Sequence, residues 1–339
     1  MRITQQGIAK IAGVSQATVS RVLSGDDRVE LDIRDRVLGV VASHNYRPDM
    51  RARSLRQQRT GLVGLVLRRE PQELEGDPFF SMLISGIIGY LVDTPFHLCV
   101  DVANDDSETA VYDEMLRSRR VDGIILVESS PDDERIARLR VDEFPFVVIG
   151  NPLIEDSFSV DNDNRLAGKL ATKHLIEQGY QRIAFLSGPR DLTVCGDRAQ
   201  GYCDAMAEAG RPTKVVYSDF GIESARCEAH HLLNPSDRPD ALVVMDDFMA
   251  MGAVQAARGH GLAVGPDLGI VSFNDSHLCD VLENGLTSIS LGIPEMVKIC
   301  CETLIEAIEG RDTPTARRRI VPCELHVRGS SQKLKQFAL

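Results

Sequence analysis

The sequence of 339 residues lacks the features of a membrane or exported protein. No apolar run approaches the roughly 20 residues that a membrane-spanning helix needs. The first residues, MRITQQGIAK, do not follow the basic-then-apolar order of a secretory signal. Hydrophobic residues make up 43% of the chain and charged residues 26%, which favours a packed core over wholesale disorder. We expect a cytoplasmic protein of about two to three domains that enters no membrane.

Patterns that bind metals or close disulfides are also missing. The 8 cysteines are scattered, none pairs as C-x-x-C, and most lie in apolar surroundings, which indicates reduced core thiols. The 8 histidines show no metal-ligand spacing, and His230 and His231 lie in a polar stretch that predicts a surface position. We therefore expect neither a metal nor a cofactor.

The motifs of common enzyme classes are absent. No G-x-G-x-x-G follows the first predicted strand, and no G-x-x-x-x-G-K-[ST] occurs. H-E-x-x-H and G-x-S-x-G are absent as well. These absences make an enzyme the less favoured class, and we expect a protein that is not an enzyme.

The charge is unevenly distributed along the chain. The net charge is -12 at pH 7, but residues 1–60 carry 11 basic and 6 acidic side chains, a net of +5, which leaves -17 for the remainder. A small basic segment on a large acidic body suggests that only this segment meets a polyanion such as nucleic acid. Charge alone leaves open the alternative that the basic end only improves solubility.

The basic segment predicts three short helices. Gln5–Ala12 places apolar residues at helical spacing, and Gly13 follows where a helix C-cap belongs. Ser15 is a suitable N-cap for a second helix over Gln16–Leu23. A third helix over Leu31–Ser43 completes a small core. Two short helices joined by a glycine-containing turn form a helix-turn-helix.

The second predicted helix has one apolar and one polar face. The outer, polar face comprises Gln16, Ala17, Ser20 and Arg21. Gln and Arg are forked donors that suit adenine and guanine edges, and an alanine methyl can contact thymine, so this face fits the major groove. In isolation, the same face is also compatible with an ordinary solvated helix surface.

The order of residues in this segment resembles a known family. The strings IAKIAGVSQATVSRVLSGDDRV and NYRPDMRARSLR look like the DNA-binding headpiece of the lactose-repressor (LacI/GalR) family of bacterial transcription regulators. The family usually has Asp at the position of Gly7 and Asn at those of Ser24 and Asp49, so these positions depart from its pattern. The resemblance implies a set of DNA contacts, with base contacts from the second helix: Thr4, Ser15, Gln16, Ala17, Thr18, Ser20, Arg21, Arg28, Asn45, Tyr46, Ala52 and Leu55.

The stretch Pro48–Arg56 carries the second part of the resemblance. Ala52 and Leu55 lie three residues apart on a small apolar stripe surrounded by arginines. A helix of about nine residues is too short to be stable alone in water. The stretch is similar to the family's hinge helix, in which Leu55 would wedge between base pairs in the minor groove and bend the duplex. A flexible basic linker is the alternative.

From Gly61 onward the chain alternates apolar runs with amphipathic stretches, which is typical of an α/β fold with parallel sheets. Ligands of such sheets bind beyond the carboxyl ends of the strands. The predicted strands are Leu62–Leu67, Leu98–Val102, Gly123–Val127, Phe146–Ile149, Arg182–Ser187, Val215–Tyr217, Ala241–Met245, Gly269–Phe273 and Thr287–Ser290. The predicted helices include Phe80–Leu91, Ser107–Arg117, Asn164–Gln178, Arg198–Ala209 and Phe248–Gly259.

This body resembles the effector-binding core of the same family, which is similar to periplasmic sugar-binding proteins of type I. The markers include DPFF at 77–80, VDNDN at 160–164 and DRAQGY at 197–202. The resemblance implies two lobes joined by three crossings around a cleft. It divides the chain into an all-α headpiece at 1–46, a hinge and linker at 47–60, a core at 61–329 and a tail at 330–339. Within the core, the first lobe spans about 61–160 and 290–320, and the second about 161–289 and 321–329.

The resemblance carries seven residues over to the cleft: Phe79, Phe80, Asn151, Arg198, Phe220, Asp246 and Asn274. Aromatic rings suit the apolar faces of a sugar, and forked donors and planar acceptors suit its hydroxyls, because unpaired buried polar groups are costly. Each phenylalanine is equally compatible with core packing, and Asp246 with the N-cap of the next helix, although we expect Asp247 to take that role. The motifs are most similar to members that respond to maltose or related α-glucosides.

The expected mechanism joins these parts. Two-fold related heads of a homodimer would contact the two half-sites of a pseudo-palindromic, double-stranded operator. A small-molecule effector, a mono- or oligosaccharide, would change the angle between the lobes and so the spacing of the hinges. We expect a repressor of carbohydrate-utilisation genes. The alternative is a corepressor-dependent regulator that responds to a non-sugar metabolite or a partner protein.

Overall fold

The computed structural model describes residues 3–23, 25–46, 59–69, 74–102, 108–234, 237–282, 284–311 and 317–333. The chain divides into two compact units, Met1–Thr60 and Gly61–Leu339.

The first unit is a three-helix bundle with the predicted bounds: α1 (Gln5–Ala12), α2 (Gln16–Leu23) and α3 (Leu31–Ser43). α1 ends at Gly13, which adopts a left-handed backbone (φ 68°) and donates its N–H to the Ala9 carbonyl. Helices of this length are not stable alone in water, so they depend on a shared core. Buried apolar residues from all three helices form that core: Ile8, Ala9, Ala12, Val19, Val22 and Val37.

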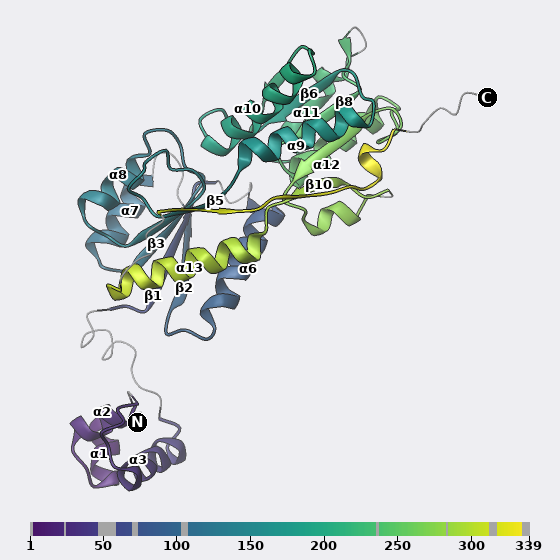
Figure 1. The fold of residues 1–339 in the computed structure, drawn as a ribbon. Coiled ribbons are helices and arrows are strands. Elements are labelled where there is room, and N and C mark those ends of the chain that lie inside the picture. The colour runs from purple at the N-terminus through teal and green to yellow at the C-terminus, as the bar shows by residue number, and fades with distance from the viewer. Residues whose placement is uncertain are drawn as a thin grey trace. The chain divides into compact units, whose positions relative to one another are not determined.

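The second unit contains two six-stranded sheets, each flanked by helices (Figure 1). The strand order is β11-β5-β4-β3-β1-β2 in the first sheet and β12-β10-β9-β8-β6-β7 in the second. Neighbouring strands are parallel except for β10 and β12, so the prediction of parallel sheets is confirmed. We call the part built on the first sheet the first lobe and the part built on the second sheet the second lobe. The strands are β1 (Leu62–Leu67), β2 (His97–Val102), β3 (Gly123–Val127), β4 (Phe146–Ile149), β5 (Ser159–Asn162), β6 (Ile183–Ser187), β7 (Val215–Tyr217), β8 (Ala241–Val244), β9 (Gly269–Phe273), β10 (Thr287–Ser290), β11 (Arg318–Val321) and β12 (Glu324–His326).

The helices of the second unit pack in pairs: α9 contacts α10, α11 contacts α12, and α13 contacts α6. α9 and α10 lie unusually close, because a Cβ atom at Gly168 would come within 2.1 Å of the Arg198 carbonyl oxygen. The helices are α6 (Pro78–Leu91), α7 (Glu108–Arg117), α8 (Glu134–Val141), α9 (Asn164–Glu177), α10 (Thr193–Glu208), α11 (Ile222–Leu232), α12 (Asp247–Gly259) and α13 (Ile293–Glu309).

The chain passes between the two sheets three times: after β5, after β10 and between β11 and β12. Three approximate lobe boundaries and the start of the tail need correction. Ser290 of β10 lies in the second sheet and Val321 of β11 in the first, the reverse of the predicted division at these two residues. The first lobe does not end at residue 160, because β5 extends to Asn162 within the first sheet. The tail does not begin at residue 330, because Ser330 and Ser331 are buried and belong to the short 3-10 helix η3 (Gly329–Ser331).

All nine predicted strands are present, with ends within one residue of the prediction. Three strands were not predicted: β5, β11 and β12. The sequence of β5 is polar although its residues are buried, β11 begins with two exposed arginines at a sheet edge, and β12 has 3 residues. α10 begins at Thr193 rather than Arg198, and its first residue is held by hydrogen bonds from the Thr193 amide and hydroxyl to the Ser129 carbonyl, although Gly196 disfavours this turn.

Three further observations concern membrane, metal and cysteine chemistry. None of the helices in the described ranges combines the length and apolar character of a membrane span. Within the same ranges, no three His, Cys, Asp or Glu side chains gather closely enough to hold a metal ion. His230 and His231 are exposed, as predicted.

The 8 cysteines are free thiols. Cys227 is exposed, so the interpretation of the cysteines as core thiols does not extend to it.

Candidate functional site

α2 presents a polar face at the surface of the first unit. The Ser15 Oγ accepts a hydrogen bond from the Thr18 amide at 3.0 Å and so caps the helix. Gln16, Ala17 and Arg21 are exposed, which leaves their side chains accessible to a partner.

Ser20 does not belong to this exposed face. Its exposed fraction is 6%, so the prediction that Ser20 lies on the outer face with Gln16 and Arg21 is wrong. α1 and α3 both pack against α2, and in so small a unit they cover more of the helix than its apolar stripe. Ser20 is therefore less accessible for a base contact than Gln16, Ala17 and Arg21.

Thr4 and Gly7 fix the start of α1. The Thr4 Oγ1 accepts a hydrogen bond from the Gly7 amide at 3.2 Å and caps the helix. Gly7, where the family usually has Asp, is compatible with a complete α1, and a Cβ atom there would approach the Ile3 Cγ1 to 2.8 Å. Gly7 therefore departs from the family pattern at a position where a larger residue would press against Ile3.

The remaining head residues differ in accessibility. Arg28 is exposed but donates to both carboxylate oxygens of Asp26, at 2.9 and 2.8 Å, and this pairing lowers the pKa of Asp26 to about 2. Asn45 is exposed with a left-handed backbone (φ 45°), whereas Tyr46 is half-buried against the core of the head. The predicted hinge at Pro48–Arg56, with Ala52 and Leu55, and the departures at Ser24 and Asp49 lie outside the described residues.

The second unit contains a cavity at the carboxyl ends of its parallel strands, the position at which such sheets bind ligands. Residues one or two positions after strands of both sheets line it: Arg69 after β1, Glu128 and Ser129 after β3, Gly150 after β4, Asp246 after β8, Asn274 after β9 and Leu291 after β10. We call this cavity the cleft.

Five of the seven predicted cleft residues line this cavity: Phe79, Arg198, Phe220, Asp246 and Asn274. Phe80 does not. It is 2% exposed and lies in the core, in edge-to-face contact with Phe79 at a centroid distance of 5.3 Å. The alternative of core packing therefore describes Phe80, whose ring lies behind the lining, with its centroid 5.5 Å from the guanidinium carbon of the cleft residue Arg69.

Asn151 lies beside the cleft rather than in its lining. Its Nδ2 donates to the Asp197 carboxylate at 3.3 Å, and its carbonyl accepts from the Ser129 hydroxyl at 2.9 Å. Ser129 in turn contacts Thr193 of the second lobe, whose amide donates to the Ser129 carbonyl at 3.0 Å. The Thr193 hydroxyl also donates to the Ser129 carbonyl, at 3.0 Å. These residues join the two lobes along one side of the cleft.

Arg198 is held rigidly from the second lobe. Its Nε donates to the Asn164 Oδ1 at 2.9 Å and its Nη1 to the Met245 carbonyl at 2.8 Å. Its guanidinium carbon lies 4.3 Å from the ring centroid of Phe273. Burial lowers the pKa of Arg198 from its ordinary value, although neighbouring acidic groups oppose this.

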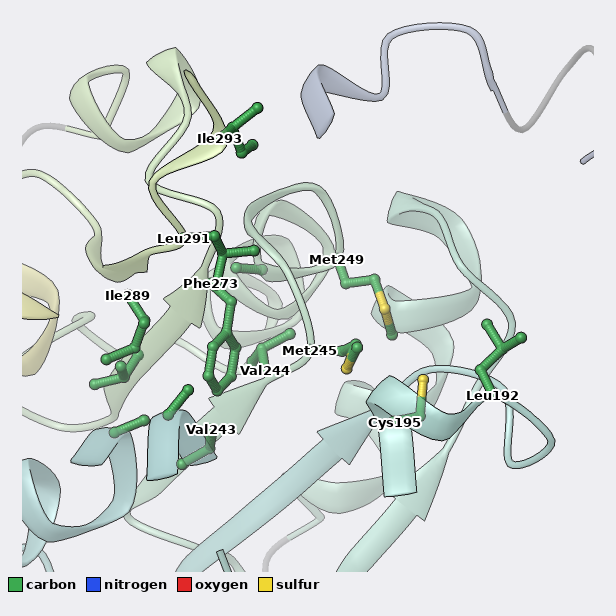
Figure 2. Close-up of a cluster of buried hydrophobic side chains, with 14 of the residues drawn as sticks. Leu192, Cys195, Val243, Val244, Met245, Met249, Phe273, Ile289, Leu291 and Ile293 are labelled. Carbon is green, nitrogen blue, oxygen red and sulfur yellow. The ribbon is translucent and has the colours of Figure 1, made fainter. Parts of the chain in front are cut away.

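The floor around Arg198 is apolar. Met245 and Leu291 line the cavity and belong, with Phe273, to the main core of buried hydrophobic side chains. Figure 2 shows the three side chains close together in this cluster. An apolar floor with a few fixed polar groups is typical of a small-molecule site.

The first lobe contributes four charged residues that the sequence analysis did not identify as cleft residues: Arg69, Asp77, Glu128 and Asp161. Arg69 donates from Nε and Nη2 to the Glu128 carboxylate, and both side chains are at least nine-tenths buried. Burial disfavours the charge on Arg69, but Glu128 outweighs it, so the pKa of Arg69 lies above its ordinary value. For Arg69 and Glu128, the available signal was a charged residue one or two positions after a buried strand, as in LVLRR and IILVE, and for Asp77 it was an N-cap Asp before a proline.

Asp246 contributes an acceptor from the second lobe and also caps α12. Its Oδ1 accepts from the Met249 amide at 2.6 Å. The expectation that Asp247 caps α12 is wrong, because Asp247 accepts instead from the hydroxyls of Ser272 and Ser288. Burial, with the nearby Asp77 carboxylate, raises the pKa of Asp246 to about 7.

Asn274 occupies a strained position at the end of β9. Its backbone and that of Asp275 both lie in the left-handed region, with φ 98° and 51°. Arg328 holds the turn by donating to the Asp275 carboxylate at 2.7 Å. Such strain is common at ligand sites and persists only where neighbouring contacts support it.

Comparison with known proteins places these parts in one family. Residues 4–49 match the model for bacterial regulatory proteins of the lacI family, and residues 172–331 match that for a periplasmic binding protein-like domain. The HTH-type transcriptional regulator CelR of Thermobifida fusca is 32% identical over 322 residues, which cover 93% of this chain and 95% of CelR. The chain belongs to the lacI family.

Solved structures agree with this lacI-family assignment. A transcriptional regulator CelR–cellobiose complex matches with a TM-score of 0.74 and 29% identity, over 97% of this chain and 100% of the other. The lac repressor dimer bound to operator and an anti-inducer matches in fold, with a TM-score of 0.85 and 22% identity, over 98% of this chain and 99% of the other. This lacI-family chain is a DNA-binding transcriptional regulator with a helix-turn-helix head and a two-lobed, periplasmic-binding-protein-like core.

Proposed function

We propose that this regulator is a homodimeric repressor of carbohydrate-utilisation genes, which binds a pseudo-palindromic operator and releases it when a small sugar occupies the cleft. The observation that carries the proposal is the presence, in one chain, of an exposed α2 face and a cleft lined from both lobes. The chain would act in the cytoplasm, where its DNA target lies, and would bind its ligand without converting it.

The DNA contacts in this proposal come mainly from α2. Gln16 and Arg21 carry forked donors for base edges, and Ala17 offers a methyl for thymine. Ser15, Thr18 and Thr4 lie at helix N-termini, which suit phosphate oxygens. Leu55 would wedge in the minor groove, an element of the proposal that rests on the sequence resemblance.

A dimer is supported by exposed apolar side chains in the first lobe. Ile88 and Val92, on and just after α6, are 51% and 72% exposed, and Val100 on the edge strand β2 is 43% exposed. α6 and β2 contact each other, so these side chains belong to neighbouring elements. Apolar side chains grouped at the surface often mark a protein interface. Two copies joined here would supply the two heads that a two-fold operator requires.

The cleft supports a sugar effector by its mixture of groups. Phe79 and Phe220 offer ring faces, while Arg198, Asp246 and Asn274 offer fixed donors and acceptors. Hydroxyl groups both donate and accept, so they can satisfy such a lining. The cellobiose bound in the CelR structure is consistent with this class of ligand.

The proposal is tested by selecting tight-binding duplexes from a random library with the full chain, then titrating the best duplex with and without sugars. We expect a pseudo-palindrome of about 16–20 base pairs. We also expect about 100-fold weaker binding when the effector is present. Recovery of no common sequence, or of a single half-site bound by a monomer, would contradict the proposal. A sugar that tightens binding would favour the corepressor alternative, and conversion of the sugar during incubation would show an enzyme.

A further inference from the structure

The charges that line the cleft do not balance. The lining residues include four carboxylates, from Asp77, Glu128, Asp161 and Asp246, against two guanidinium groups, from Arg69 and Arg198. Asp161 is partly compensated from outside, since Arg318 donates to it at 3.0 Å. With Arg318 included, four carboxyl groups face three guanidinium groups, so the described lining offers an entering anion no excess of positive charge.

Neither arginine is free to bind an anion with its full fork. Arg198 already donates to the Asn164 side chain and the Met245 carbonyl. Arg69 donates from two nitrogens to Glu128, and its guanidinium carbon lies 3.6 Å from the ring centroid of Phe220, from the second lobe. A bidentate phosphate or carboxylate contact requires two parallel donors of one arginine. At Arg69, the two parallel donors Nε and Nη2 are already bonded to the Glu128 carboxylate.

One donor of Arg69 remains. Its Nη1 is buried and has no hydrogen-bond partner, although the side chain as a whole is 7% exposed. A buried donor without a partner is costly unless a ligand or water satisfies it. Since Arg69 lines the cleft, a bound ligand is placed to accept this hydrogen bond.

Acceptors lie near this donor. Asp77 caps α6 through the Phe79 amide at 2.9 Å, and Asp246 caps α12 through the Met249 amide at 2.6 Å. Both carboxyl groups are buried and interact electrostatically with each other and with Arg69. A guanidinium donor beside carboxyl acceptors suits a group that both donates and accepts, which is a hydroxyl.

We propose that the cleft selects an uncharged polyhydroxyl effector, bound at its first-lobe end by Arg69, Asp77 and Asp246, and rejects anionic relatives such as sugar phosphates and sugar acids. This inference rests on the proposed effector function of the cleft. Glu128 and Phe220 act as positioning residues that orient the Arg69 guanidinium from opposite lobes.

The test compares ligands that share a carbon skeleton, using the full-length chain and isothermal titration calorimetry. The neutral set is glucose, ribose, maltose and cellobiose, and the charged set is glucose 6-phosphate, ribose 5-phosphate, glucuronate and glucosamine. We expect a neutral sugar to bind about 100-fold or more tightly than its anionic counterpart, because like charges in a buried site are strongly unfavourable. An anionic or cationic compound that binds as tightly as the best neutral one overturns the proposal, and so does the absence of binding by every compound.

Operator binding in the same samples separates this inference from the proposed function. A sugar phosphate that binds the cleft and releases the operator would overturn the selectivity and leave the regulator intact. A chain that binds no specific duplex would overturn the proposed function, while calorimetry still measures the selectivity of the cleft.

Isosteric variants test which residues impose the selectivity. Asp77→Asn removes one negative charge from the cleft, and we expect the preference for neutral over anionic ligand to fall about tenfold. Asp237→Asn, at a side chain that is 81% exposed, is the matched control and should leave the preference unchanged. The ratio is measured within one preparation, so partial unfolding affects both ligands equally. An unchanged ratio in Asp77→Asn would contradict the assignment.

Arg69→Lys tests the remaining donor. Lysine keeps a positive charge for Glu128 but loses the planar fork that reaches both Glu128 and the ligand. We expect the affinity for the neutral ligand to fall about tenfold, with the preference over its anionic counterpart retained. Unchanged affinity for the neutral ligand would exclude a contact from Arg69.

Discussion

The α2 face and the cleft present functional side chains in opposite ways. On α2, Gln16 and Arg21 are exposed and come from one 8-residue helix. In the cleft, Arg69, Arg198 and Asp246 are buried, and they come from segments far apart in the sequence. A change on α2 therefore removes one contact to a partner, whereas a change in the cleft also leaves buried protein groups unpaired.

This difference predicts which variants separate DNA binding from stability. Replacing an exposed side chain costs little folding free energy, whereas replacing a buried hydrogen-bonded one costs desolvation and packing. Variants of α2 should thus lose operator binding in a stable protein. Variants of the cleft should lose the effector response and some stability together.

The largest effect is expected for Arg198→Ala. The change leaves Asn164 and the Met245 carbonyl without their donor and opens a cavity beside Phe273. We expect the free energy of unfolding to fall by about 3–5 kcal/mol and the effector affinity by about 100-fold or more. Calorimetry and urea unfolding measure the two effects. Arg165→Ala, which removes an exposed ion pair with Asp204, is the control and should change neither. A normal effector response in Arg198→Ala would show that the cleft has been assigned wrongly.

The next effect is a pH dependence at Asp246. Its pKa is raised from 3.8 to about 7, so the folded state holds a proton that the unfolded state loses between these values. Burying the charged form therefore costs more free energy as the pH rises through this window, up to about 4 kcal/mol above it. Asp246→Asn keeps the helix cap and removes that cost.

Unfolding of the two proteins at about pH 5 and about pH 8 checks this prediction. The stability of Asp246→Asn relative to the wild type should increase with pH over this range. Asp237→Asn should show no such trend. A stability difference that stays constant with pH would contradict the assigned environment of Asp246.

Arg21→Ala tests the α2 face. We expect operator affinity to fall by about 10- to 100-fold, because a bidentate base contact contributes about 1–3 kcal/mol. Effector binding and stability should not change, because Arg21 is exposed. Arg36→Ala on α3 also removes an exposed positive charge and should weaken all duplexes uniformly. Fluorescence anisotropy with operator and scrambled duplexes distinguishes the two. Equal losses on both duplexes in Arg21→Ala would argue against base contact.

The smallest effect is expected for Ser15→Ala. Loss of the cap on the Thr18 amide should reduce the stability of the head by about 1 kcal/mol. Operator binding should weaken modestly, and thermal unfolding monitored by circular dichroism measures the change. A Ser15→Thr variant, which retains the hydroxyl, should preserve most of the stability.

The same comparison explains what the sequence could predict. The three head helices and the nine strands of the body follow from local periodicity and caps, and their bounds were predicted to within one residue. The polar strand β5 was missed because its burial comes from neighbouring strands rather than from its own sequence. Ser20 was misplaced for a similar reason, since tertiary packing covers it.

The cleft was predicted only where the family motif supplied a residue. Arg198, Asp246 and Asn274 were expected, but Arg69 and Glu128 were not, because these two residues pair with each other from distant parts of the chain. Asp77 was missed because its sequence position indicates only a helix cap. The roles of Asp246 and Asp247 were exchanged, since either residue can cap α12 by sequence position alone. Whether such a residue lines the cleft depends on the tertiary contacts it makes, which residue type alone does not predict.

The central claim is that one chain couples the α2 face to the cleft. It is tested most directly by titrating the selected operator duplex with the full-length protein, at increasing concentrations of the neutral sugar that binds most tightly. The account predicts that the operator affinity falls as the cleft fills, with a midpoint at the calorimetric dissociation constant, and that Arg198→Ala abolishes this shift. Operator affinity that stays constant while the cleft is saturated would contradict it.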